Sequence, residues 1–154
     1  MSVGFCIFLK FIFSQFSESQ PRDLNLDHAM EMIRVVMEKA NEVETPVAIC
    51  IKDRHDNLVA HVRMTNTMLG STDLACQKAK SSALFPFPSE GLKGLPGIEL
   101  SNGIISNLGG GLPLYTASGV SVGSIGVSGA TVVGMDTEIA QVAVDIIDSI
   151  LESN

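Results

Sequence analysis

The stretch NLGGGLPLYTASGVSVGSIGVSGAT, residues 107–131, contains seven of the 14 glycines of the chain and decides the fold. From Val120 to Val127, apolar residues alternate with serine and glycine, which is the period of a strand with one side small enough for close packing. The triplet 109–111 permits positive φ angles and close approach of another backbone, and Pro113 cannot donate to a strand ladder. The stretch therefore predicts a hairpin and a turn at the centre of the domain.

The glycines allow two interpretations. In the first, they serve turn geometry and tight sheet packing. In the second, Gly109, Gly110, Gly111, Ser128 and Gly129 belong to a ligand cradle, in which the backbone N–H groups of Ser128, Gly129 and Ala130 form an anion-binding concavity. A phosphate loop of the form GxxxxGK[ST] is absent from the sequence, so we do not expect nucleotide binding.

Composition limits the classes of partner. The 154 residues suit one domain, and 45% hydrophobic against 18% charged residues, with a mean hydropathy of +0.31, leaves little charged surface. We therefore expect a homo-oligomer. The net charge of −7 comes without a basic stripe, which argues against binding to nucleic acid.

The three cysteines do not form a recognisable framework. Cys6, Cys50 and Cys76 are an odd number without C-x-x-C spacing, so neither a set of disulfides nor a structural zinc site is indicated. Within VAICI, Cys50 reads as a small hydrophobic residue of a core strand. The pattern favours a reducing, cytoplasmic setting.

Residues 1–22 form an N-terminal extension of unknown role, and residues 23–154 form the domain. The apolar part of the extension is too short to span a bilayer, so no membrane span is expected. Its first positive charge, Lys10, lies inside the apolar run, whereas a secretory signal carries its positive charge before that run. An amphipathic segment that docks on the core or on a neighbouring subunit is the simpler interpretation.

The order of periodic segments predicts an α+β fold with an antiparallel sheet of about five strands. Three helices are expected: one capped by Asn25, one from Ser71 to Leu84, and a final one capped by Asp136. The apolar stripe of the first helix is Leu26, Met30, Ile33, Met37 and Ala40. The expected strands are 47–51, 58–64, one starting at Ile104 and Ile105, 112–116 and 120–127.

The segment 85–102, FPFPSEGLKGLPGIELSN, predicts a long loop with three prolines and three glycines. Loops of this length in compact domains are mostly functional, as lids, binding loops or subunit contacts. Phe85 and Phe87 either face a ligand or anchor the loop on the core, and both interpretations stay open.

Two motifs carry a resemblance to a known family. GGGLP at 109–113 and GSIGVSGAT at 123–131 resemble the GlcG/HbpS-like family, which includes the C-terminal domain of PduO-type corrinoid adenosyltransferases and small proteins that accompany diol or glycerol dehydratases. The resemblance covers about residues 24–152 and implies a profilin- or PAS-like sheet with helices packed on it. It also places Lys78, within ACQKAK, at a lysine of the family. The helix entry VVGMD departs from the family pattern and keeps only Asp136.

The family contains haem-binding members, so the resemblance implies a tetrapyrrole or another small anionic ligand. His61 shares a strand face with Arg63, which would suit a haem propionate beside an axial ligand. Met64 and the single tyrosine, Tyr115, are the other candidate ligands of iron. His28 and His55 occupy positions where solvated histidines are common.

No nucleophile, base and orienting acid form a recognisable catalytic motif. We therefore favour a non-enzymatic accessory protein that binds a small ligand, either haem or a corrinoid-related molecule, and is linked to diol, glycerol or glycolate metabolism. One alternative is an enzyme acting on a small hydroxy acid or a corrinoid-related substrate. Another is a structural subunit, for which changes at Phe85 and Phe87 would alter assembly but not ligand uptake.

Overall fold

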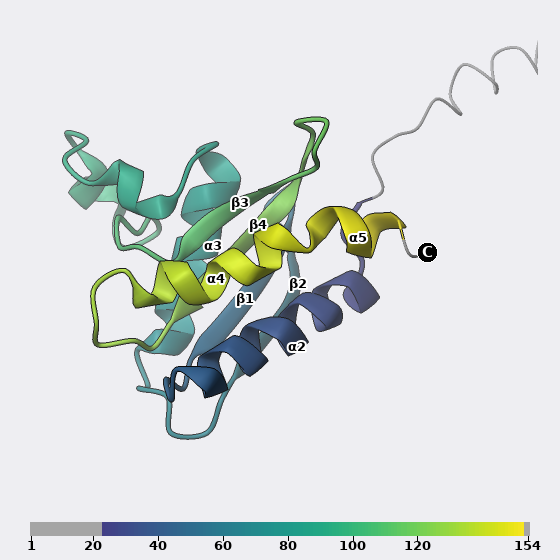
Figure 1. The fold of residues 1–154 in the computed structure, drawn as a ribbon. Helices are drawn as coiled ribbons and strands as arrows, with labels where there is room; N and C mark the ends of the chain where they lie inside the picture. The colour runs from purple at the N-terminus through teal and green to yellow at the C-terminus, as the bar shows by residue number, and fades with distance from the viewer. Residues whose placement is uncertain (1–22, 153–154) are drawn as a thin grey trace, which may run out of the picture.

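Two β-hairpins joined side by side form the sheet at the centre of the molecule (Figure 1). The structure is a computed structural model that describes residues 23–152, so the expected N-terminal extension at residues 1–22 lies outside the described residues. The strands are β1 (Ala48–Asp53), β2 (Leu58–Arg63), β3 (Gly111–Tyr115) and β4 (Ser121–Ser128). Their order is β2-β1-β4-β3, and every neighbouring pair is antiparallel. The α+β class is confirmed.

The described residues form four strands, so the expectation of about five was wrong by one. Ile104 and Ile105 do not begin a strand. The backbone that follows them is bonded to a helix instead, because Ser106 donates its N–H to the Ser81 hydroxyl at 2.8 Å. Two adjacent isoleucines also lack the alternation that would give a strand a buried and an exposed side.

Three helices cover one face of the sheet: α2 (Leu26–Glu42), α4 (Met135–Asp145) and α5 (Ile147–Glu152) (Figure 1). The main hydrophobic core lies between these helices and the sheet. Its largest fully buried side chains include Met32, Val36, Ile49, Ile51, Ile125 and Ile139.

The start of α2 was predicted correctly, and its buried face was predicted in part, because Ile33 and Ala40 are buried as expected. The Asn25 side chain accepts from the backbone N–H of His28, and the His28 ring accepts from the backbone N–H of Asn25. This capping box removes His28 from solvent, contrary to the expectation of a solvated ring. Leu26 and Met30 are exposed, and the buried stripe runs through Ala29 and other residues about one position away.

Helix α3 (Ser71–Leu84) lies on the opposite face, where small residues let it approach the sheet closely. A side chain at Gly126 of β4 would collide with the backbone of Ala75 and Ala79, so only glycine fits there. The expected cap Ser71 is the first helical residue, and the N-cap position is held by Gly70 without a side-chain hydrogen bond.

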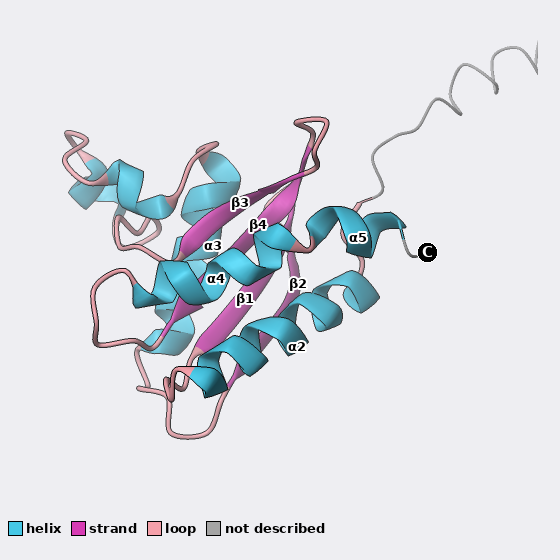
Figure 2. Cartoon of the chain, viewed as in Figure 1, coloured by secondary structure: helices cyan, strands magenta, loops and turns pink. Residues whose placement is uncertain are grey.

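The long loop after α3 is partly ordered into two short 3-10 helices, η1 (Ser89–Leu92) and η2 (Ile98–Ser101). Figure 2 shows the loops that connect them to each other and to β3. Leu92 is fully buried, and η1 packs against α3 and β3. Within residues 23–152, no helix combines the length and the apolar character needed to cross a bilayer.

Candidate functional site

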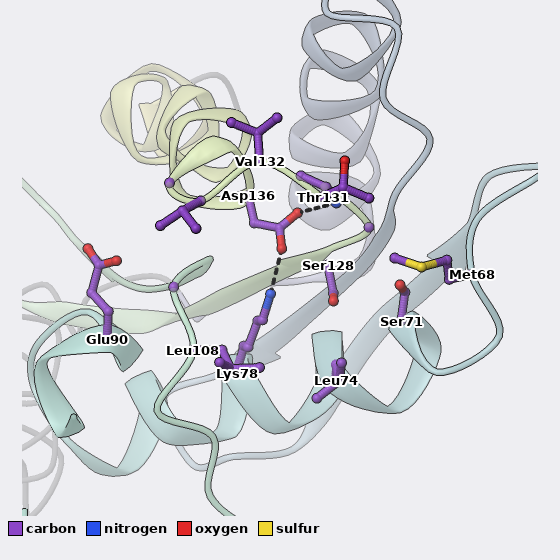
Figure 3. Close-up of a pocket in the computed structure, with 15 residues that line it drawn as sticks. Met68, Ser71, Leu74, Lys78, Glu90, Leu108, Ser128, Thr131, Val132 and Asp136 are labelled. Carbon is purple, nitrogen blue, oxygen red and sulfur yellow. Dashed lines mark hydrogen bonds and ion pairs between the residues drawn. The ribbon is translucent and has the colours of Figure 1, made fainter. Parts of the chain in front are cut away.

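A pocket of about 260 Å³ opens between α3, the end of β4 and the turn that leads into α4 (Figure 3). Its polar lining comes from Ser71, Lys78, Glu90, Ser128, Thr131 and Asp136. Its apolar lining comes from Met68, Leu74, Leu108, Val132 and Val133, and a backbone wall from Gly109 and Gly129 completes it.

A buried ion pair stands at the inner wall of this pocket. Lys78 extends from α3 to Asp136, and its Nζ lies 2.7 Å from Asp136 Oδ2 (Figure 3). The side chains are only 3% and 14% exposed, so solvent screens their attraction weakly. Lys78 Nζ also donates to the Val127 carbonyl at 2.9 Å. The Lys78 ammonium is therefore buried and bound to two partners, rather than solvated or extended along the surface.

Asp136 has a different role from the helix cap that its position predicted. The N-cap of α4 is Gly134, with a positive φ of 86° and no side-chain hydrogen bond. Asp136 lies in the first turn, where Oδ1 accepts from the backbone N–H of Ala130 at 2.9 Å and Oδ2 binds Lys78. One carboxylate thus ties α3, the end of β4 and α4 together around the pocket.

The glycine triplet is needed for close packing beside this ion pair. Gly110 has a φ of 110°, and a Cβ there would contact the Val127 carbonyl, Asp136 and the Lys78 ammonium. A Cβ on Gly111 would collide with the Lys78 backbone. Gly111 N–H donates to the Ser89 hydroxyl at 3.0 Å, so this donor of the expected anion cradle has a partner within the protein.

Polar groups also gather around Gly109, at the side of the pocket formed by η1. A Cβ on Gly109 would meet Glu90 Oε2 and Thr137 Oγ1. The Thr137 hydroxyl is buried and has no hydrogen-bond partner among the described residues. A ligand group that enters beside Gly109 would find an acceptor in Glu90, whereas Thr137 does not line the pocket.

The mouth of the pocket is apolar and strongly exposed. Met68 is 54% exposed, Leu108 51%, Val132 62% and Val133 101%. In Figure 3, Met68 and Ser71 lie on the opposite side of the pocket from Glu90. Exposed apolar side chains that surround a hollow are typical of surfaces that bind a ligand or another protein.

Of the residues predicted to bind ligand, Lys78, Gly109, Ser128 and Gly129 line the pocket, with Gly110 directly behind Lys78. Arg63 lies beside the same loop as Met68, because its Nη1 donates to the Thr67 carbonyl at 2.9 Å. The sequence did not predict that Met68, Glu90 and Asp136 also line this pocket.

The remaining predicted residues lie elsewhere. His61 is on the sheet face covered by α3, with Nδ1 at 3.7 Å from Cys76 Sγ. Tyr115 is opposite Ser121, at the far end of β3 from Gly111. Phe85 and Phe87 form a tilted ring pair with centroids 6.1 Å apart at the start of the long loop. None of these side chains lines the pocket.

Histidine, cysteine and carboxylate side chains do not gather in threes that could hold a metal ion anywhere in residues 23–152. A metal centre built wholly from such side chains is therefore not part of the described fold. An iron that arrives inside a tetrapyrrole needs only one or two axial ligands, and a thioether is one of the groups that serve.

Residues 24–145 match the family model described as "Haem degrading protein HbpS-like". The corrinoid adenosyltransferase PduO of Salmonella typhimurium is 29% identical over 135 residues, covering 82% of this chain and 40% of PduO. The chain thus spans well under half of that relative. The solved structure of the Klebsiella pneumoniae protein ORFY has a TM-score of 0.75 and 29% identity, covering 90% of this chain and 97% of that one. The PduOC:heme complex has a TM-score of 0.73 and 28% identity, covering 82% and 96%.

Proposed function

The chain belongs to the HbpS-like family, and we propose that it binds a tetrapyrrole, with haem as the first candidate, as a non-enzymatic accessory protein. The observation that carries the proposal is the exposed apolar mouth of the pocket, formed by Met68, Leu108, Val132 and Val133. A flat apolar macrocycle would remove these side chains from water.

The volume of the pocket determines which part of such a ligand enters it. Pockets that enclose a drug-sized molecule measure about 300–1,000 Å³. At about 260 Å³, this one admits a side group of a tetrapyrrole but not the whole ring. The macrocycle would therefore lie across the mouth, with one edge inside.

The side chains at the mouth suit haem. Met68 offers a thioether, one of the donors that hold haem iron, and bound haem would supply a redox-active iron. Arg63, exposed and anchored to the Thr67 carbonyl beside Met68, offers a guanidinium for a propionate. The structure of a PduOC:heme complex, 28% identical to this chain, supports the choice of haem.

The test is a haem titration followed by absorption spectroscopy on the wild type and on Met68→Ala. We expect a saturable, shifted Soret band in the wild type and a weaker, altered band in the variant. Met30→Ala is the matched control, because Met30 is 49% exposed but lies on α2, outside the pocket lining. Its titration should equal that of the wild type.

His61→Ala and Tyr115→Phe complete the series, because both side chains are candidate iron ligands outside the pocket. Loss of the band in either variant, with Met68→Ala unchanged, would move the iron away from the mouth. A flat response in the wild type would overturn the haem proposal.

A second candidate function is an enzyme acting on a small hydroxy acid or a corrinoid-related substrate. The observation that favours it is the Lys78–Asp136 pair in the pocket wall, with the Ser71 and Ser128 side chains in the lining of the same pocket. Turnover of glycolate or a corrinoid that disappears in Asp136→Asn would support an enzyme. Absence of turnover across such a panel would leave binding as the function.

A further inference from the structure

A pair of thiols lies on the sheet face covered by α3, outside the pocket. Cys50 is in the centre of β1 and fully buried, and Cys76 is on α3 and half-buried. They belong to a small cluster with Ala48, Ala75 and Ala79, whose short side chains bring the helix close to the strand. Neither thiol lines the pocket.

His61 completes this cluster from β2. It is directly opposite Cys50 in the antiparallel register, so the two side chains share one face of the sheet. Its Nδ1 lies 3.7 Å from Cys76 Sγ. Its Nε2 is buried and has no hydrogen-bond partner among the described residues. The ring is therefore held against Cys76 without a competing partner in the part of the chain that the structure describes.

The surroundings of the two thiols shift their pKa values in opposite directions. The interaction between the two thiols lowers the pKa of Cys76 to about 7 and, together with burial, raises the pKa of Cys50 far above its usual range. Beyond that interaction, burial and Asp73 raise the pKa of Cys76, whereas Lys52 lowers it. Burial lowers the pKa of His61, so the imidazole is neutral near pH 7 and can accept a thiol proton. Asp56 adds to the raised pKa of Cys50.

We propose that Cys76 is a peroxide-reactive thiol and that Cys50 converts its oxidised form into a disulfide between α3 and β1. The Cys76 thiolate attacks one peroxide oxygen, the O–O bond breaks, and the leaving hydroxide takes a proton to form water. The Cys50 sulfur then attacks the resulting sulfenic acid. The S–O bond breaks, an S–S bond forms, and the released hydroxide takes the Cys50 proton. Two thiols and one hydrogen peroxide give one disulfide and two waters.

The proposal stands apart from haem binding, because it uses no pocket residue. It nevertheless touches the pocket through α3, since Cys76 lies two positions before Lys78 on the same helix. A bond from Cys76 to β1 would restrain the helix that carries one partner of the buried ion pair. Oxidation by peroxide would thus change the mobility of the helix that carries Lys78 in the pocket wall.

The experiment uses the full chain. Reduced protein receives an equimolar amount of hydrogen peroxide, remaining thiols are blocked with iodoacetamide, and peptides are mapped by mass spectrometry, which separates Cys6 from the other two cysteines. We expect a linked Cys50–Cys76 peptide that disappears after reduction. The alkylation rate of Cys76 in untreated protein should be half-maximal near pH 7, against about pH 8.5 for an ordinary cysteine.

Two variants separate the roles. In Cys50→Ala, Cys76 should stop at the sulfenic acid and be trapped by dimedone, whereas in Cys76→Ala, Cys50 should stay reduced. Wild-type protein in which peroxide produces no Cys50–Cys76 link would overturn the disulfide, whether or not the variants fold. An alkylation profile of Cys76 centred near pH 8.5 or above would overturn the reactive thiol.

Discussion

At the scale of single residues, Lys78 and Asp136 are charged residues that the fold buries as an ion pair. Lysine and aspartate are rarely buried unless they are paired, and here each has at least two partners. The pair joins residues 58 positions apart in the chain. Their opposite charges were visible in the sequence, but nothing in it indicated that they would meet.

Breaking this pair should destabilise the fold strongly. Lys78→Met leaves the Asp136 carboxylate partly buried without its cation, for which we expect a loss of about 3–5 kcal/mol in the free energy of unfolding. Chemical denaturation would measure it. Lys80→Met is the matched control on the same helix, because Lys80 pairs with Asp56 at 3.3 Å and is 35% exposed, so its loss should stay below about 1 kcal/mol. Equal losses in the two variants would contradict the structural role of Lys78.

At the scale of elements, the contact of α3 with β4 depends on Gly126. The alternation around this residue correctly predicted a strand with a small side. What packs on that side is α3, whose backbone at Ala75 and Ala79 lies where a Cβ of residue 126 would be. Because this is main chain, the contact cannot be relieved by a rotamer change.

Gly126→Ala should therefore displace α3 and destabilise the domain by several kcal/mol, at or above the usual 1–3 kcal/mol for overpacking. Gly70→Ala is the control, since a Cβ at Gly70 would meet nothing within 4 Å. Thermal unfolding followed by circular dichroism would compare them. A Gly126→Ala protein with the melting temperature of the wild type would show that the helix is not seated as described.

At the scale of the whole molecule, we propose that the valines of the turn before α4 contact a second copy of the chain when no ligand covers the pocket mouth that they border. Val132 is 62% exposed and Val133 101%, which leaves two β-branched apolar side chains in water. The sequence composition predicts a homo-oligomer, because it leaves little charged surface. A second copy that covers this turn would bury apolar area at about 25 cal/mol per Å².

We expect the double substitution Val132→Ser and Val133→Ser to shift the ligand-free protein to a smaller assembly in sedimentation equilibrium. Leu26→Ser is the control, because Leu26 is 57% exposed but lies at the start of α2. It should leave the mass unchanged. A wild type that sediments as a monomer at all concentrations would remove the basis for the homo-oligomer.

Local patterns by themselves determined most of the elements: the capped start of α2, both hairpins, the extent of α3 and the α+β class. These follow from periodicity and turn chemistry, which act between neighbours in the chain. The two glycine motifs also determined the family, and residues 24–145 match it. The fifth strand failed because its backbone is bonded to Ser81 of α3, which local pattern does not show.

Only the tertiary structure decided the site. It placed Met68, Glu90 and Asp136 around Lys78, and it moved His61 beside Cys76 on the other face of α3. Contacts of this kind join residues far apart in sequence, and their energy depends on burial and on the direction of side chains. Both are set when helices and sheet pack together, because packing alone determines which charges lose their water and find each other.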